Sequence, residues 1–536
     1  MFPEATRHTL IRSLSAYAVV DHSLSRVPSV FIVLAVSLLL WRIWTFTIAP
    51  ALRPREPKIL PYWIPVLGHV VPFFKNSDAV FTFGREYFGN TREPYTISVV
   101  GENIYVLTSP QDVAAVYKSK SLSFDPVMRD VVATFGATPS SAEKMWQSPA
   151  DQGSANPRKS FMELSHENYK AQLHPGAKLD TLQDRFLGSI DESLRWQNIS
   201  HNVVRSSSQE TKIVSLLGWC SEVLIDSATR AFFGPRLLQI EPNLLQSSID
   251  FDDNSWKFNY QIPRFLAKET YTAKDRITVA LEKYFNLPEE EREESAWMIQ
   301  ALEMDMRKVG LDEQQLASMI MVLHWVINAN AYKLCFWVLS YLLYDPALFK
   351  VIRDEVKPAF SEESTNLQYL LQSCPRLESV YNEVLRIANM PIGARGVLSD
   401  VEIGGKTLLA GRKVLMPYRQ LHFDEDVFGS NVRHFDPDRF LNNKDLSRSP
   451  SYRPFGGAST LCPGRFLAKR EVYMFVALVL HRFDISLATA EKDVSSVAGE
   501  KPSPPAFPRL DEAKPTGGMM GPIAGDDVYI NVRTLA

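Results

Sequence analysis

The sequence has few cysteines and no pattern that groups them. Its four cysteines, Cys220, Cys335, Cys374 and Cys462, are widely spaced in 536 residues and include no CxxC pair. Small secreted domains rely on dense disulfide frameworks, and zinc sites need clustered Cys or His ligands. Neither class fits this chain, so we expect its thiols to be reduced.

An excess of charge of either sign is also lacking. The 58 Lys and Arg residues nearly balance the 61 Asp and Glu residues, which leaves a net charge of −3. Proteins that bind nucleic acids usually carry a strongly basic surface. We therefore expect no nucleic-acid partner. The sequence also shows no internal repeat and no low-complexity tract that would divide it.

A long apolar run is present near the N-terminus. Residues 27–48 read VPSVFIVLAVSLLLWRIWTFTI, apolar apart from Arg42, and meet the length of about 20 residues that crosses a bilayer. Trp41 and Trp44 suit the membrane interface. A cleaved signal peptide would end in a small-residue cleavage site, which the run lacks. We predict a tail at 1–26 and a retained single-pass anchor at 27–48, with basic residues on both flanks slightly favouring a cytosolic domain.

The rest of the chain predicts a hinge and one large domain. Four prolines, Pro54, Pro57, Pro61 and Pro65, predict an extended hinge over 49–69. Beyond it, 70–536 predicts a single domain, mainly α with small β-sheets: a hairpin around Gly101, long helices over about 311–344 and 366–389, and short strands near the end. Two polar stretches, 137–157 and 197–212, predict surface insertions.

Cys462 lies in the stretch RPFGGASTLCPGRF. Pro463 suits the first position of a helix, and the apolar spacing after it predicts a helix that starts at the sulfur. Free N–H groups and the positive end of the helix dipole would favour a thiolate. A single thiolate suits a macrocycle that brings four nitrogens and needs one axial ligand, so haem iron fits. The alternative is a buried cysteine ahead of a core helix.

The surrounding residues resemble the haem-binding signature of the cytochrome P450 family. The matching positions are Phe455, Gly457, Cys462, Gly464, Arg465 and Ala468. Ala458 departs from the usual glycine, and Thr460 replaces a basic residue that pairs with a haem propionate in many members. TLCPGR, HWVINANAYKLCFW and the C-terminal segment resemble most closely the branch of prostacyclin synthase and the sterol 7α- and 12α-hydroxylases.

This resemblance implies the fold, the cofactor and several roles. The fold would be the cytochrome P450 fold preceded by an N-terminal transmembrane helix. The cofactor would be haem b, with Cys462 as its axial ligand and Phe455, Gly464 and Arg395 in contact with it. Glu383 and Arg386 look like the family's ExxR pair and Arg439 like its third member, a network that would lock the loop presenting Cys462.

The central helix departs from the family at its most informative positions. LASMIMVLHWVINANAYKLCFWVLSYLLYDP is too apolar all round for a surface helix. In the family this helix crosses the distal face of the haem and usually carries an acid followed by threonine, where this chain has Asn330 and Ala331. Cleavage of dioxygen consumes two protons, and neither an amide nor a methyl relays protons by acid–base exchange.

Three interpretations remain open at this point. Water held by Asn330 and Asn328, or a hydroxyl of the substrate, carries the protons of a monooxygenase. Alternatively, the enzyme isomerises a peroxide, as prostacyclin synthase does, and needs neither electrons nor protons. In the third, Asn330 only satisfies a break in the helix hydrogen bonds. We favour the first, with Asn330 and Ala331 lining the oxygen pocket.

The favoured function is a membrane-anchored monooxygenase that inserts one oxygen atom from O2 into an apolar sterol, terpenoid or other secondary-metabolite intermediate. The resemblance implies NADPH–cytochrome P450 reductase as partner, with cytochrome b5 as a further candidate, in the endoplasmic-reticulum membrane. The reductase would dock on the cysteine side near Arg465, Lys469 and Arg470. The alternatives are a haem-thiolate isomerase of hydroperoxides or endoperoxides that needs no reductase, and a non-catalytic haem-binding membrane protein.

Overall fold

The computed structural model describes residues 31–148, 159–361, 365–488 and 505–535. The described chain is mainly α with three small β-sheets, as the sequence predicts. The predicted tail at 1–26 and the first four residues of the predicted anchor lie outside the described residues.

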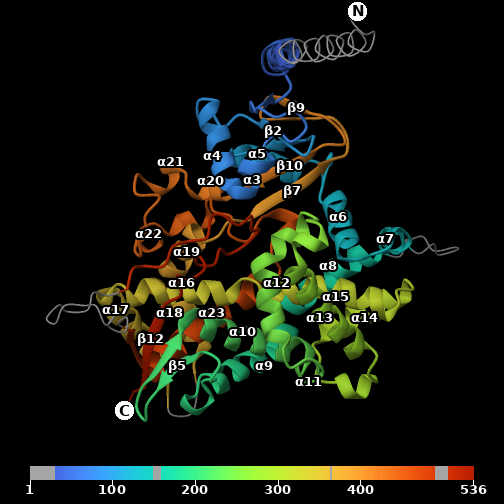
Figure 1. Cartoon of the computed structure of the whole chain (residues 1–536). Helices are drawn as coiled ribbons and strands as arrows, with labels where there is room; N and C mark the ends of the chain where they lie inside the picture. Colours follow the sequence, from blue (N-terminus) through green and yellow to red (C-terminus); the bar gives the residue numbers. More distant parts are fainter. Residues whose placement is uncertain (1–30, 149–158, 362–364, 489–504, 536) are drawn as a thin grey trace, which may run out of the picture.

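The apolar N-terminal run is helical and projects from one end of the molecule (Figure 1). Helical residues 31–43 continue through the π-helical turn η1 (Trp44–Ile48) into α2 (Ala49–Leu52). The segment Phe31–Leu52 has a mean hydropathy of 2.0 and is not buried. At 1.5 Å per residue it is about 33 Å long, enough to cross a bilayer. The helix extends four residues past the predicted end of the anchor.

The proline-rich segment contacts the N-terminal helix at one point and the domain at another. The guanidinium of Arg42 lies 4.0 Å from the ring centroid of Trp63 and donates to the carbonyl of Tyr62. The two-residue strand β1 (Lys58–Ile59) pairs in parallel with Tyr95 and Thr96 of β2 (Tyr95–Val99). Segment 49–69 is therefore partly helix and partly an edge strand of a sheet, rather than an extended linker throughout.

The largest sheet joins distant parts of the sequence. Its strand order is β1-β2-β3-β10-β7-β4. The predicted hairpin consists of β2 (Tyr95–Val99) and β3 (Glu102–Val106), and Val100 and Gly101 turn it with positive φ angles of 51° and 78°. β10 (Lys413–Pro417) pairs in parallel with β3 and antiparallel with β7 (Ile392–Val397), which pairs in turn with β4 (Leu122–Ser123). This pairing places Arg395 of β7 in the interior of the domain, where it is 3% exposed.

The predicted central helix is two helices. α15 (Glu313–Asn328) ends before Ala329, and α16 (Ala331–Leu343) begins after Asn330. α16 crosses the middle of the molecule (Figure 1) and packs against α10 (Leu216–Phe233), α19 (Pro375–Ile387) and α23 (Arg465–Arg482). Because 72% of its most apolar window is buried in the domain, Glu313–Leu343 is a core element rather than a second membrane span. α12 (Leu244–Asn259) and α13 (Lys268–Phe285) pack together against α15.

The C-terminal strand belongs to a second sheet, in the order β11-β12-β6-β5. β12 (Tyr529–Thr534) pairs with β11 (Phe483–Leu487) and with β6 (Lys212–Ser215), which pairs with β5 (Val204–Ser207). The second half of the predicted surface insertion over 197–212 is exposed and forms the edge hairpin of this sheet, because β5 pairs with the neighbouring β6. The pairing of β6 with β12, more than 300 residues away, is what joins this hairpin to the domain, and no local pattern reports it.

The other elements complete the helical body. The predicted helix over 366–389 is divided at Cys374 into α18 (Leu367–Ser373) and α19. A two-stranded sheet joins β8 (Val401–Ile403) and β9 (Lys406–Leu408). The remaining helices are α3 (Val70–Lys75), α4 (Ser77–Tyr87), α5 (Pro110–Lys118), α6 (Asp125–Phe135), α7 (Pro139–Trp146), α8 (Phe161–Leu173), α9 (Ala177–Ser193), α11 (Arg236–Ile240), α14 (Trp297–Lys308), α17 (Pro346–Val356), α20 (Arg419–His422), α21 (Glu425–Phe428) and α22 (Arg439–Asn442), with 3-10 turns η2 (Trp196–Asn198), η3 (Arg264–Leu266), η4 (Glu289–Arg292), η5 (Lys357–Ala359), η6 (Lys444–Arg448) and η7 (Ala458–Thr460).

Candidate active site

Cys462 lies on a tight loop that leads into α23. The helix begins at Arg465, three residues after the position that the sequence predicts, because Pro463 and Gly464 form a turn first. The backbone N–H groups of Gly464 and Arg465 nevertheless donate to the sulfur. The Cys462 N–H donates to the carbonyl of Phe455 at 2.9 Å, which closes the loop. The other three cysteines are buried, whereas Cys462 as a whole residue is exposed even though neighbouring atoms displace much of the water around its sulfur.

The protein alone does not favour the thiolate. Loss of water around the sulfur is the largest influence on the pKa of Cys462 and raises it above the ordinary value. The N–H groups of Gly464 and Arg465 and the charge of Arg465 lower that pKa, but they do not reverse the net shift. The start of the helix therefore lowers the pKa of Cys462, as the sequence predicts, but this effect is smaller than the effect of burial. A bound metal cation would supply the missing stabilisation.

The glycines before the cysteine let the chain pass close to other groups. A Cβ atom on Gly457 would lie 2.6 Å from Nη1 of Arg453 and 2.9 Å from the ring of Tyr117. Gly456 has a φ of 79°. Ala458, where the related signature has glycine, also has a positive φ of 49°, a conformation that is unfavourable for an alanine.

Two arginines near this loop have no acidic partner in the described part of the chain. Arg395, which is 3% exposed, donates from Nη2 to Oγ1 of Thr460 at 2.8 Å. The guanidinium groups of Arg395 and Arg453 lie 5.0 and 5.5 Å from the ring centroid of Tyr117. Within the described residues neither arginine forms an ion pair with a carboxylate. Burial lowers the pKa of Arg395, and a buried cation without a counter-ion is costly.

These features fit a haem. A sulfur that accepts two N–H groups suits an axial ligand, and two arginines without carboxylate partners suit the propionates of a porphyrin. Thr460 stands where the related signature often has a basic residue, and it accepts a hydrogen bond from Arg395 of β7. Arg395 therefore brings a basic side chain to this part of the loop. Gly464 lies against the sulfur, where an added Cβ would be 3.8 Å away. Phe455 closes the loop through its carbonyl.

Glu383, Arg386 and Arg439 form one buried ion-pair network. The two oxygens of Glu383 accept from Nη2 and Nε of Arg386 at 2.7 and 2.8 Å, and Nε of Arg439 lies 3.1 Å from Oε1. Glu383 and Arg386 are fully buried and Arg439 is 7% exposed. Arg386 also donates to the carbonyls of His422 and Val432, and Arg439 donates to Oδ1 of Asn431. Every charge in the network is therefore compensated by hydrogen bonds.

The network reaches the cysteine loop through one histidine. Nε2 of His422 accepts the backbone N–H of Arg453 at 3.0 Å, while its carbonyl accepts from Arg386 at 3.1 Å. Nδ2 of Asn389 donates to the carbonyl of Pro454 at 2.9 Å. Burial and the nearby Arg386 and Arg419 lower the pKa of His422 to about 3, so its ring is a neutral acceptor.

Asn330 and Ala331 lie at the break between α15 and α16. Asn330 is exposed, and its Oδ1 accepts the backbone N–H of Met519 at 2.9 Å from the C-terminal segment. Its Nδ2 donates to no other described residue. Gly518 allows this approach, since a Cβ there would lie 2.2 Å from Oδ1. Asn330 therefore fastens the break to a distant segment, while half of its amide stays free for a ligand or water. Ala331 is half-buried and brings no polar side-chain atom.

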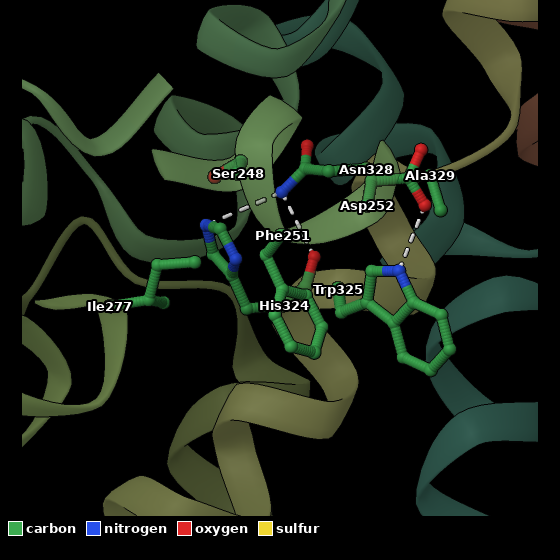
Figure 2. Close-up of a pocket in the computed structure, with 8 residues that line it drawn as sticks. All are labelled: Ser248, Phe251, Asp252, Ile277, His324, Trp325, Asn328 and Ala329. Atoms are coloured by element: carbon green, nitrogen blue, oxygen red, sulfur yellow. Dashed lines mark hydrogen bonds between the residues drawn. The ribbon is translucent and has the colours of Figure 1, made fainter. Parts of the chain in front are cut away.

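Asn328 has different surroundings from Asn330. Its Nδ2 donates to the carbonyl of His324 at 3.0 Å and lies 3.4 Å from Nε2 of the same histidine (Figure 2). Among the described residues, its Oδ1 and Nδ1 of His324 are buried without a partner. Burial lowers the pKa of His324 to about 4. A small cavity lies beside them, lined by Ser248, Phe251, Asp252, Ile277, His324, Trp325, Asn328 and Ala329.

Two of the three cations predicted to face a partner are already paired. Nζ of Lys469 lies 2.7 Å from Glu378, and Nη1 of Arg470 lies 3.3 Å from Asp180. Arg465 donates to the carbonyl of Cys462 at 2.8 Å. The local positive charge is therefore smaller than the sequence suggests.

Sequence reasoning missed Arg453, Tyr117 and Asp252. Arg453 stands nine residues before Cys462 and could have been found as the basic residue that opens the loop. Tyr117 and Asp252 had no signal, since their positions near the loop and near the helix break depend on packing between distant elements.

Comparisons with known proteins find similarity to one enzyme family. A model of the cytochrome P450 family matches residues 333–504. Cytochrome P450 monooxygenase poxD of Penicillium oxalicum is 25% identical over 455 residues, covering 82% of this chain and 89% of the relative. Cytochrome P450 monooxygenase nodJ of Hypoxylon pulicicidum is 25% identical over 473 residues, with coverage of 82% and 85%. The human 7-alpha-hydroxycholest-4-en-3-one 12-alpha-hydroxylase is 24% identical over 480 residues, with coverage of 83% and 89%.

Proposed function

Because the chain belongs to the cytochrome P450 family, we propose that this P450 monooxygenase is anchored in the endoplasmic-reticulum membrane and hydroxylates an apolar small molecule. The substrate class would be a sterol, a terpenoid or a related secondary metabolite. The names of the relatives support this class, since fungal monooxygenases and sterol 12α-hydroxylases both match over most of the chain. The unburied helix Phe31–Leu52 supports the anchor, with the domain 70–536 in the cytosol.

The single observation that carries the proposal is the environment of Cys462. Its sulfur accepts the N–H groups of Gly464 and Arg465, and a neutral histidine and a buried ion-pair network hold the loop before it. Cys462 would be the axial ligand of haem b, and Arg395 and Arg453 would hold its propionates. When bound, the haem would supply the activation of dioxygen.

The reaction would consume two protons and two electrons: RH + O2 + 2 e− + 2 H+ gives ROH + H2O. The chain has no acid at Asn330 and no hydroxyl at Ala331 to move these protons. Asn330 is held at Oδ1 by Met519, so its free Nδ2 would orient a water molecule or a hydroxyl of the substrate. Ala331 would leave room for that oxygen.

The electrons would come from NADPH through a flavoprotein reductase, with cytochrome b5 as a second donor. The docking surface would be the cysteine side, where Arg465 pairs with no described carboxylate and Lys469 and Arg470 are partly neutralised. Replacing Lys469 and Arg470 by Gln should slow turnover driven by the reductase and leave turnover driven by peroxide unchanged. Equal slowing of both would reject this surface.

A reduced, carbon-monoxide-bound absorption spectrum tests the proposal. The purified full-length chain should show the long-wavelength band of a haem thiolate, and Cys462→Ala should lose it. Turnover of sterol and terpenoid libraries should then require NADPH and the reductase. A thiolate spectrum without any turnover would instead indicate a non-catalytic haem protein.

The second candidate is an isomerase of a hydroperoxide or endoperoxide. One observation favours it: the break in the central helix presents an amide and a methyl instead of a proton-carrying pair. An isomerase would convert its substrate at the same rate with and without reductant. The paired assay therefore separates the two functions.

A further inference from the structure

One carboxylate receives hydrogen bonds from both sides of the break in the central helix. Asp252 lies on α12, and its Oδ1 accepts Nε1 of Trp325 at 2.9 Å (Figure 2). Its Oδ2 accepts the hydroxyl of Tyr332 at 2.9 Å and Nζ of Lys333 at 2.6 Å. Trp325 belongs to α15, before the break, whereas Tyr332 and Lys333 belong to α16, after it.

The pair formed by Asp252 and Lys333 is buried. Their side chains are 8% and 9% exposed, so water contributes little to their charges. Within the described residues, Asp252 is the carboxylate that forms an ion pair with Lys333. Such a pair holds its geometry strongly because moving either partner leaves an uncompensated charge in the interior.

Asn330 is thus held from two directions. Its Oδ1 is fastened to Met519 of the C-terminal segment. The helices that flank it are fastened to Asp252 of α12, and Ala329 lines the same cavity as Asp252. Because Asp252 bonds to both halves, a displacement of α12 would change the angle and the spacing between α15 and α16.

We propose that Asp252 is the positioning residue of the distal pocket: it braces the two halves of the central helix and so fixes where Asn330 and Ala331 lie. This inference rests on the proposed monooxygenase function. If Asp252 has this role, the reaction with oxygen depends on the position of α12, because the hydrogen bonds of Asp252 form only when α12 is packed on α15 and α16. With the brace lost, the same two electrons and two protons would reduce O2 to H2O2 and leave the substrate RH unchanged, because water or substrate beside Asn330 would no longer be oriented.

The test compares two buried carboxylates, one that bonds to both sides of the helix break and one that lies elsewhere in the domain. Asp252→Asn removes the charge of the brace and keeps its shape. Glu303→Gln is the matched control. The side chain of Glu303 is 8% exposed and lies 2.6 Å from the buried Arg292. Glu303 belongs to α14 and Arg292 to η4, so neither lies at the break. Both variants should retain the thiolate spectrum and lose thermal stability. Only Asp252→Asn should lower the product formed per NADPH consumed, by about tenfold or more.

Hydrogen–deuterium exchange gives a readout that does not depend on turnover. In the haem-loaded protein, the amides of residues 325–333 should exchange faster in Asp252→Asn than in Glu303→Gln. The proposal is overturned if exchange and coupling are unchanged in Asp252→Asn, or if Glu303→Gln reduces coupling equally. If the wild type shows no reductant-dependent turnover, the proposed function fails, while the exchange comparison still decides whether the brace exists.

Milder variants serve if Asp252→Asn does not fold. Tyr332→Phe removes one donor to the brace and keeps its ring. Tyr95→Phe is the control, because its buried hydroxyl donates to the carbonyl of Phe81 at 2.8 Å, between β2 and α4 rather than at the break. Faster exchange over 325–333 together with a lower product yield in Tyr332→Phe alone supports the brace. Identical behaviour of the two variants rejects it.

Discussion

Nε2 of His422 accepts the backbone N–H of Arg453 at 3.0 Å, nine residues before Cys462. The same histidine accepts Arg386 through its carbonyl, so a single residue joins the buried ion-pair network to the cysteine loop. This contact gives a physical route by which a helix 76 residues away in sequence can hold the loop that would bind iron.

Removing the charge of Glu383 should disrupt both the network and the loop. Glu383→Gln leaves Arg386 and Arg439 without their shared buried counter-ion, so we expect a loss of about 3–5 kcal/mol in the free energy of unfolding. Denaturant unfolding measures this loss, and haem content should fall with it. Glu378→Gln removes a half-exposed pair with Lys469 and should change stability by less than about 1 kcal/mol. Similar losses in the two variants would contradict the prediction.

The buried His422 should weaken the protein in acid. Its pKa is about 3 in the folded chain, below the ordinary value of 6.5. Between these two values the unfolded chain binds a proton that the folded chain does not, so the free energy of unfolding should fall as pH decreases from about 6.5 towards 3. His422→Gln keeps an acceptor for Arg453 and should flatten this part of the curve. An unchanged slope would mean that other groups cause the acid sensitivity.

The buried Glu471 should lower the stability of the fold as pH rises, whereas His422 lowers it as pH falls. Burial on α23 raises its pKa to about 8 from the ordinary value of 4.5. The folded chain therefore keeps a proton that the unfolded chain releases, and stability should fall as pH rises from about 4.5 to 8. Thermal unfolding across this range should show a smaller decline in Glu471→Gln. A decline that is the same in both proteins would count against a protonated Glu471.

Replacing Ala458 of the cysteine loop by glycine should stabilise the fold. Ala458 has a φ of 49° and is exposed, so glycine would relieve backbone strain without removing a contact in the core. We expect Ala458→Gly to stabilise the fold by about 0.5–1 kcal/mol, the strain of about 1–2 kcal/mol less the added flexibility of the unfolded chain. Denaturant midpoints at constant slope measure the difference. Destabilisation would show that this loop has another conformation in solution.

Arg395 should be needed to retain haem. Arg395→Met keeps an apolar stem between Tyr117 and Phe124 but removes a buried cation that pairs with no carboxylate among the described residues. Loss of a charge-assisted hydrogen bond should speed transfer of haem to apomyoglobin by about tenfold or more. Arg412→Met is the control, because Arg412 donates to the hydroxyl of Tyr105 rather than to a residue of the cysteine loop. Equal transfer rates would remove Arg395 from the haem site.

Most features that could be predicted from the sequence depend on residues that lie close together in it. The spacing around Cys462 indicated a loop followed by a helix, because turn and helix signals act over a few residues, although Pro463 and Gly464 delay the helix to Arg465. Glu383 and Arg386 are three apart on one helix, so their contact follows from helical geometry. The apolar run of the central helix predicted its burial but not its break at Ala329 and Asn330.

The sequence by itself determined the haem-thiolate signature, the membrane-length helix and the mainly helical fold, since each depends on residue types at short and regular separations. Only the tertiary structure decided that Asp252 bridges the two halves of the central helix, that Arg395 reaches Thr460, and that His422 holds Arg453. It also decided that the pKa of Cys462 is raised rather than lowered. These outcomes depend on which distant elements pack together and how much water they exclude, and no local pattern encodes either quantity.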